Sequence, residues 1–178
     1  MAASLAVRPT AVRQAACGEG LWSLKTLSDP RRNRVNLRPR ATTVAAINSR
    51  PEPERTPTRR TAFELQVWQV TAQITEYKLM HDEDIHLILE EDGAYMIAEM
   101  PAADCLLRRT RDRRAIVSAR QLFESRCGPA TDAWQQLGAH VQISGVGFWD
   151  SPHGQTPAAL NDAELHPVTG IRFLAGCA

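Results

Sequence analysis

Residues 68–100, WQVTAQITEYKLMHDEDIHLILEEDGAYMIAEM, contain the pattern on which the fold assignment rests. Apolar and polar residues alternate from Trp68 to Ile74, which is typical of a half-buried β-strand because successive side chains point to opposite faces. Residues 85–90 alternate in the same way, and residues 94–100 form a third apolar run. The Asp-Gly pair at 92–93 is typical of a tight hairpin turn, because glycine tolerates a positive φ. This stretch therefore predicts three meandering strands.

The next segment has a helical pattern. Residues 110–127 predict an α-helix, because Ile116, Ala119 and Phe123 fall on one face. Thr110 is expected to cap this helix, and Gly128 is expected to end it.

Two more strands are predicted after the helix, at residues 141–150 (VQISGVGFWD) and 165–173. Gly145 and Gly147 indicate a bulge or a sharp bend in the first of them. Three strands, one helix and two strands follow in the order of a five-stranded OB-like barrel. The fold expected is therefore mainly β with one helix, and a small α+β roll is the alternative.

The first third of the chain differs from the rest in charge and in proline content. Residues 1–60 contain 12 of the 21 Lys and Arg, only four of the 20 Asp and Glu, and six of the 11 prolines. Such a segment buries too little apolar surface to offset the entropy lost on ordering. We expect a basic, Pro-rich arm over residues 1–61, mostly disordered or extended, and one globular domain over residues 62–178.

Some classes of protein are excluded by what the sequence lacks. The chain contains no Walker loop and no G-x-G-x-x-G, CxxC or HExxH motif, which are the usual nucleotide and zinc signatures. No apolar run approaches the roughly 18–20 residues that a membrane-spanning helix needs, so no transmembrane segment is expected.

The compartment and the cysteine pairing stay open at this point. Arg8 and Arg13 interrupt the apolar start, which indicates a cytoplasmic protein if the start is correct and an exported one if an upstream signal is missing. The four cysteines have no metal-binding spacing. Cys105 and Cys127 bracket the predicted helix, so a disulfide between them is one alternative and free thiols are the other.

Several short motifs resemble a family of bacterial proteins whose activity is uncharacterised. The matching segments are DIHL at 84–87, MIAE at 96–99, GVGFWD at 145–150 with HGQ at 153–155, ELHPV at 164–168, and WSLKT at 22–26. The resemblance covers most of the chain after Cys17 and implies an OB-like domain, but it implies no particular activity. Some members carry an export signal ahead of the position of Cys17, where this chain differs from them.

A group of His, Asp and Glu residues predicts where chemistry takes place. Glu164 and His166 are two residues apart, so they project from one face of the last predicted strand. In an OB barrel the third strand pairs with the second and the fifth, so Glu99 is expected between His86 and His166. Two imidazoles and a carboxylate are the ligand set of many catalytic zinc or iron sites. We expect a divalent metal at His86, Glu99 and His166, with Asp84, His153 and Glu164 as lesser candidates. Histidines that are hydrogen-bonded to Asp or Glu for structural reasons are the alternative.

Aromatic and basic residues provide two further candidate sites. Phe148, Trp149 and His153 predict a ligand-binding surface, and burial of the two rings in the core is the alternative. A cluster of arginines predicts contacts to nucleic-acid phosphates together with the basic arm, and a solvated surface is the alternative. The arginines of this cluster are Arg108, Arg109, Arg111, Arg113 and Arg114.

Three functions are compatible with these candidates. The first is a small OB-like module that binds a ligand or a protein partner and has no chemistry of its own. The second is a metal-assisted hydrolase that uses the His and Glu residues. The third is a nucleic-acid binder that works through the basic arm. The sequence alone does not decide between them, nor whether the protein is an enzyme.

Overall fold

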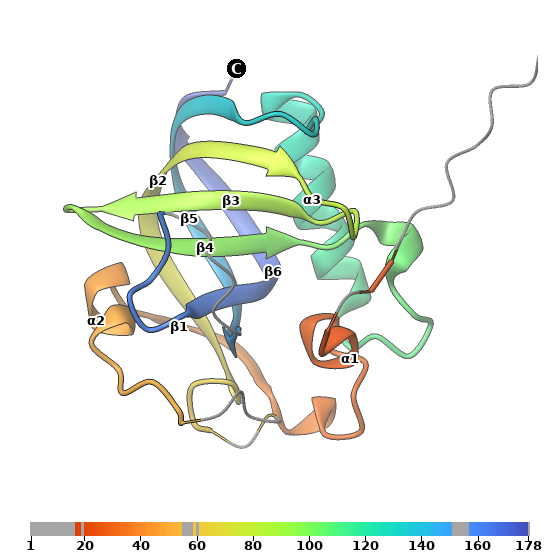
Figure 1. Ribbon diagram of the computed structural model, residues 1–178. Coiled ribbons are helices and arrows are strands. Elements are labelled where there is room, and N and C mark those ends of the chain that lie inside the picture. The colour runs from red at the N-terminus through yellow and green to blue at the C-terminus, as the bar shows by residue number, and fades with distance from the viewer. Residues whose placement is uncertain (1–16, 19, 55–58, 60, 151–156, 178) are drawn as a thin grey trace, which may run out of the picture.

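Figure 1 shows the computed structural model, which describes residues 17–18, 20–54, 59, 61–150 and 157–177. Its strands are β1 (Asn36–Ala41), β2 (Gln66–Leu79), β3 (Ile85–Glu91), β4 (Ala94–Met100), β5 (Gln135–Trp149) and β6 (Ala163–Ala175). Its helices are α1 (Trp22–Lys25), α2 (Val44–Asn48), α3 (Arg113–Cys127) and two 3₁₀ turns, η1 (Arg32–Arg34) and η2 (Ala103–Cys105). Within the described residues, no helix combines the length and apolarity needed to cross a membrane.

Five strands close into a ring, which confirms the predicted OB-like barrel. β2 pairs with β3, β3 pairs with β4, and β5 pairs with both β6 and β2, always in antiparallel orientation. The ring closes through β4 and β6, which are parallel. α3 lies between β4 and β5 in the chain, so the strand order and the helix position are those of the OB topology. β1 is a sixth strand, parallel to β2 and outside the ring.

The barrel has an apolar interior and one polar outer face that is also covered. Ile85, Leu87 and Leu89 of β3 are fully buried in the main apolar core. His86 and Ile88, which alternate with them and point to the opposite side, are each only 1% exposed. The outer side of β3 is therefore removed from solvent as well, and polar side chains placed there need partners within the protein.

Residues 20–54 differ from the expected irregular arm. They contain α1, η1, β1 and α2. Leu27 and Val35 are buried in a second, smaller apolar core against the barrel, and Val44 and Ile47 of α2 are buried in the main core. These apolar residues are too sparse to form a core of their own, but the barrel supplies the other side of each contact. The division of the chain at residue 61 stays a prediction.

The β3–β4 hairpin turn is as the sequence predicts, whereas α3 starts later than the sequence predicts. Asp92 and Gly93 form a two-residue loop with φ values of 50° and 80°, as a tight hairpin requires. α3 begins only at Arg113, and its N-cap residue is Asp112 in the left-handed region. Thr110 therefore does not cap the helix.

Gly145 and Gly147 lie where the register of β5 against β6 shifts, which confirms the predicted bulge. A Cβ atom at Gly147 would overlap the backbone of Phe63, so we expect Gly147→Ala to destabilise the fold by about 1–3 kcal/mol. Gly138→Ala is a matched control on the same strand, because its Cβ would meet only the Gln73 side chain at 3.6 Å. Urea unfolding measures both variants, and equal midpoints would contradict the expectation.

Two disulfides are present, and they match neither alternative left open by the sequence, a Cys105–Cys127 bridge or free thiols. Cys17 is bonded to Cys105 and Cys127 is bonded to Cys177, and no described cysteine is free. The alternative of a bridge between Cys105 and Cys127 is therefore wrong, because the end of α3 lies beside the segment that follows β6. Structural disulfides of this kind are typical of proteins in oxidising compartments.

Candidate metal centre

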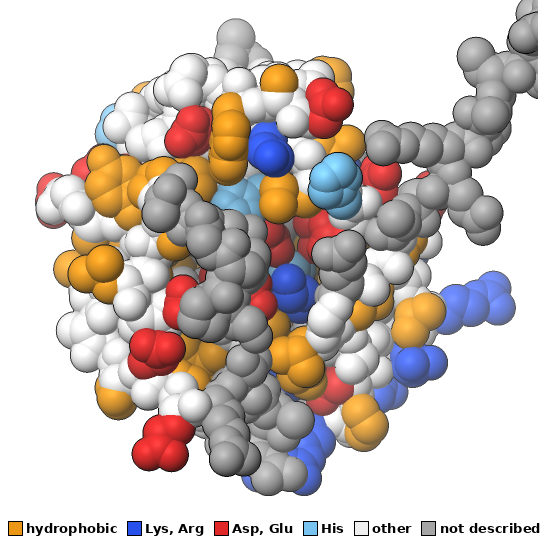
Figure 2. Space-filling model, viewed as in Figure 1, with side chains coloured by type: hydrophobic (Ala, Val, Ile, Leu, Met, Phe, Trp, Pro, Cys, Tyr) orange, Lys and Arg blue, Asp and Glu red, His pale blue; other side chains and the backbone are white. Residues whose placement is uncertain are grey.

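Strand pairing brings His86, Glu99 and His166 onto one outer face of the barrel. His86 of β3 stands directly opposite Glu99 of β4. β6 runs parallel to β4 with Glu164 beside Ile97, so two residues further along His166 lies beside Glu99. In Figure 2, His, acidic and basic side chains gather near the middle of this face. The convergence expected from the OB topology is therefore present.

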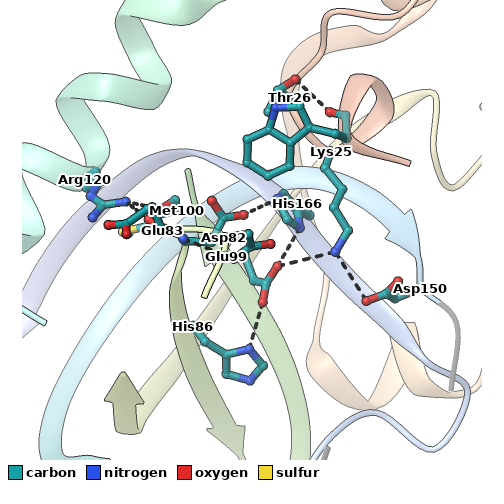
Figure 3. A network of polar contacts seen from close by, with 12 residues as sticks. Lys25, Thr26, Asp82, Glu83, His86, Glu99, Met100, Arg120, Asp150 and His166 are labelled. Atoms are coloured by element: carbon teal, nitrogen blue, oxygen red, sulfur yellow. Dashed lines mark hydrogen bonds and ion pairs between the residues drawn. The ribbon is translucent and has the colours of Figure 1, made fainter. Parts of the chain in front are cut away.

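The side chains form a continuous series of close polar contacts (Figure 3). His86 Nδ1 lies 2.8 Å from Glu99 Oε1, and His166 Nδ1 lies 2.8 Å from Glu99 Oε2. On its other side, His166 Nε2 lies 3.1 Å from Asp84 Oδ2. One carboxylate thus joins the two imidazoles, and one imidazole joins two carboxylates.

These four residues are almost completely buried. Glu99 is 4% exposed and the other three at most 1%. Charges in such surroundings are strongly destabilising unless each has a partner. The contacts between them therefore decide both the stability and the charge state of the site.

Lys25 of α1 adds a positive charge to the same face. Its Nζ atom lies 3.6 Å from Asp150 Oδ2, 4.0 Å from Glu99 Oε2 and 5.5 Å from the centre of the Phe148 ring. The side chain is nearly buried, at 11% exposure. α1 therefore completes the site from a part of the chain far from β4 in sequence.

Several buried polar atoms of the site have no hydrogen bond within the described chain. They include Nε2 of His86, Oδ1 of Asp84 and Oε2 of Glu164. The two nitrogens of His166 approach carboxylates closely, but neither is aligned as a hydrogen bond. Buried polar atoms are nearly always hydrogen-bonded, so this group of exceptions calls for an explanation.

The burial and the contacts shift the pKa values of these groups in different directions. Burial opposes ionisation of Glu99, but His166 and His86 outweigh it and hold the pKa of Glu99 well below its usual range. Burial would lower the pKa of His166, but the charge of Glu99 and the contact with Asp84 raise that pKa to about 9. Glu99 and His166 therefore form a charged pair at neutral pH.

Two other carboxyl groups retain protons more strongly than usual. Burial raises the pKa of Asp84 to about 6, although His166 opposes that shift. Burial and the negative charges of Glu99 and Asp150 raise the pKa of Glu164 well above its ordinary value. The outer face therefore carries more carboxyl groups than its own cations neutralise.

Asp84, Glu99 and His166 have the arrangement of a metal-binding set. One ligand atom from each residue can be chosen so that all three lie within 4.8 Å of one another. Zinc lies about 2.0–2.2 Å from imidazole nitrogen and carboxylate oxygen, so two ligand atoms on one ion are at most about 4.4 Å apart and this set would have to close around the ion. Asp84 therefore takes the place that was expected for His86 among the three ligands. His86 instead contacts the other carboxylate oxygen of Glu99.

The structure does not present the predicted stacking surface. Phe148 and Trp149 are only 1% and 3% exposed. The Trp149 ring packs on Phe63 in the core, and the Phe148 ring meets the His166 ring edge to face, with their centres 5.7 Å apart. Both rings are therefore unavailable to a stacked ligand, and His153 lies outside the described residues.

The predicted arginine cluster is partly engaged in the fold. Arg109, Arg111 and Arg113 donate hydrogen bonds to backbone carbonyls of other segments. Arg108 and Arg114 are exposed. These side chains are not part of the polar series on β3, β4 and β6.

Sequence reasoning missed two residues at this face. Lys25 is one; it lies within the WSLKT motif at 22–26, but that motif does not indicate which face of the barrel the lysine approaches. Trp134, just before β5, is the other; it is 44% exposed, and its ring lies 5.6 Å from the His86 ring. The alternation of apolar and polar residues in the strands does not indicate that Trp134 is exposed.

Comparison with known proteins identifies no family for this chain. No protein-family model matches the chain. No curated protein matches it. It is similar to a crystal structure assigned to an aspartyl-tRNA synthetase from Leishmania major Friedlin, with a TM-score of 0.46 and 13% sequence identity. The match covers 77% of this chain and 21% of that chain. The assignment of an OB-like barrel therefore rests on the strand order and the helix position.

Proposed function

We propose that this chain is an OB-like binding module that holds a divalent transition-metal ion on the outer face of β3, β4 and β6. Asp84, Glu99 and His166 are the proposed ligands. The observation that supports this most directly is that their ligand atoms come within 4.8 Å of one another, although the residues belong to β4, to β6 and to the position directly before β3. The second and third strands of an OB barrel, here β3 and β4, are also the strands with which this fold binds ligands.

The donor set indicates the class of metal. His166 must release its second proton to bind a metal, as ligands generally do when a metal displaces protons. One imidazole nitrogen with two carboxylate oxygens then suits Zn²⁺, Fe²⁺ or Mn²⁺ better than a thiolate-binding metal such as Cu⁺. His86 contacts the oxygen of Glu99 that points away from His166. A partner of this kind orients a metal-ligating carboxylate and is typical of metal sites.

The unpartnered atoms favour a cation over a purely structural network. Both nitrogens of His166 face carboxylate oxygens, but a hydrogen-bonded network that served stability alone would also satisfy Asp84 Oδ1, which has no hydrogen-bond partner among the described residues. A bound cation would instead give partners to the ligand oxygens, and it would neutralise the excess of carboxyl groups.

A metal-assisted hydrolase is the second candidate function. It is favoured by the number of protein ligands, because three ligands leave a further position for water or a substrate atom, as in catalytic zinc sites. The binding experiment below also tests this function, since hydrolysis by this route requires the ion.

Metal binding is expected to stabilise the folded protein. After dialysis against EDTA and removal of the chelator, ZnCl₂ or MnCl₂ should raise the melting temperature of the full chain. At a free metal concentration 100 times the Kd, the gain is about 2.7 kcal/mol. Asp84→Asn and His166→Gln should each abolish the shift.

Exposed residues of the same types provide the control. Asp92→Asn, at the tip of the β3–β4 hairpin, and His140→Gln, on β5, remove an exposed carboxylate and an exposed imidazole, and they should leave the shift unchanged. A melting temperature that does not respond to either metal would contradict the proposal. So would a response that is retained in both site variants.

A further inference from the structure

Two arginine-rich segments that are far apart in sequence meet on the surface beside α1. The first follows α1 and includes η1, and the second connects η2 to the start of α3. Together they form what we call the arginine surface: Arg31, Arg32, Arg34, Arg108, Arg109, Arg111, Arg113 and Arg114. Figure 2 shows Lys and Arg side chains gathered at the lower right, where Figure 1 places α1 and the chain that follows β4.

Hydrogen bonds to backbone carbonyls hold the two segments together. Arg111 donates from Nη1 to the carbonyls of Arg32 and Val35, at 2.7 Å each, and from its backbone N–H to Leu27 at 2.9 Å. Arg109 donates to the carbonyl of Ser28 at 3.1 Å. Neutral carbonyls, not carboxylates, accept these bonds, so the positive charge of the surface is not cancelled.

The arginine surface has almost no acidic residues of its own. Asp112 is the one acidic residue within residues 31–34 and 106–114, and exposed Asp104 of η2 borders the second segment, next to the carbonyl of Ala103 that accepts from Arg113. Asp29 lies next to the first segment, but it is buried and paired with Arg59 at 2.8 Å. Within the described residues, no arginine of this surface forms an ion pair with a carboxylate. Such a concentration of like charge opposes folding through self-repulsion and attracts polyanions.

Exposed leucines lie among these arginines. Leu107, directly before Arg108, is 41% exposed, and Leu21 is 38% exposed. Leu21 also lines, together with Pro30 and Arg31, a cavity of about 320 Å³. Leucine side chains beside cationic ones are typical of surfaces that lie in the headgroup region of a membrane.

Two observations favour a lipid surface over a nucleic acid. Binding of single-stranded nucleic acid uses aromatic side chains on which bases stack. Among the described residues, the large exposed aromatic side chains are Tyr95 on β4 and Trp134 near His86, neither of them within the arginine segments. In addition, the two disulfides are typical of oxidising compartments, where membrane surfaces are available and intracellular nucleic acids are not.

We propose that the arginine surface docks this protein on an anionic phospholipid membrane. The guanidinium groups contact the phosphates, and Leu21 and Leu107 enter the headgroup region. This inference is independent of the metal site, because it uses none of the residues on β3, β4 and β6.

Vesicle flotation tests this proposal with the full chain. The protein should bind vesicles of 70% phosphatidylcholine and 30% phosphatidylglycerol, should not bind vesicles of pure phosphatidylcholine, and should be released by 0.5 M NaCl. Arg31→Gln/Arg108→Gln removes one arginine from each segment. It should weaken binding by about fivefold for each arginine, or roughly 30-fold in all.

A second double variant tests whether binding depends on these particular arginines or only on the net charge of the protein. Lys78→Gln/Arg172→Gln removes the same number of positive charges outside the arginine surface, and it should bind as the parent does. Melting temperatures show whether each variant is folded; if Arg31→Gln/Arg108→Gln is not, Leu107→Ser replaces it, with weaker binding expected. Equal binding to both kinds of vesicle, equal weakening in the two double variants, or tighter binding to a 20-nucleotide oligothymidine than to anionic vesicles would each overturn the proposal.

Discussion

Glu99→Gln is expected to destabilise the protein by about 3–5 kcal/mol, the usual cost of removing one partner from a buried ion pair. Glu99 is the shared partner of two buried imidazoles, and Lys25 lies 4.0 Å from it. The neutral amide has nearly the same shape, so packing is preserved while the negative charge is lost. The positive charge of His166 would then be balanced by Asp84 alone. Urea unfolding at pH 7 in the presence of EDTA measures the loss.

Glu124→Gln is the matched control for this variant. Glu124 also accepts from a cation, Arg120 at 3.1 Å, but its side chain is 36% exposed. An ion pair of this kind contributes at most about 1 kcal/mol. Similar losses of unfolding free energy in the two variants would contradict the prediction, because the buried contacts of Glu99 would then contribute no more than an exposed ion pair.

The metal-free protein is expected to lose stability as the pH rises from about 6.5 to 9. His166 has a pKa of about 9 in the folded state, raised from 6.5. The folded state therefore binds this proton more tightly, so its contribution is complete below pH 6.5 and is lost as the pH rises through 9. Asp84, whose pKa is raised from 3.8 to about 6, acts in the same direction at lower pH. Each pKa unit corresponds to about 1.4 kcal/mol.

This trend is specific to His166 in the upper part of the range. His166→Gln should flatten the dependence of the unfolding free energy on pH between 6.5 and 9, whereas His140→Gln, at an exposed position on β5, should keep it. Denaturant titrations at four or five pH values measure the slope for each protein. A parent chain that becomes more stable over this range would contradict the assignment of a charged, buried His166.

The barrel was predictable because its strands carry local signals. The alternation from Trp68 to Ile74 and the Asp92-Gly93 turn depend only on neighbouring residues, and both correspond to observed elements. The leader could not be predicted in this way. Leu27 and Val35 have few apolar neighbours in sequence, and they are ordered by contacts with strands and a helix that come much later in the chain.

The candidate site was predictable where strand pairing alone determines it. His86 and Glu99 are opposed because β3 and β4 form a hairpin, and the parallel pairing of β6 with β4 adds His166. Lys25 reaches the site through the tertiary packing of α1, which no local pattern indicates. The disulfide partners could not be predicted for the same reason: tertiary packing brings Cys17 and Cys105 together, although they are 88 residues apart in sequence.

The central claim is that Asp84, Glu99 and His166 bind one metal ion, and a crystal of the full chain grown with zinc tests it most directly. An anomalous difference map recorded at the zinc absorption edge should show a peak between these residues. Its distances to one nitrogen and two carboxylate oxygens should be about 2.0–2.2 Å. A map without a peak at this position, or with zinc bound only at exposed His81 or His140, would contradict the claim.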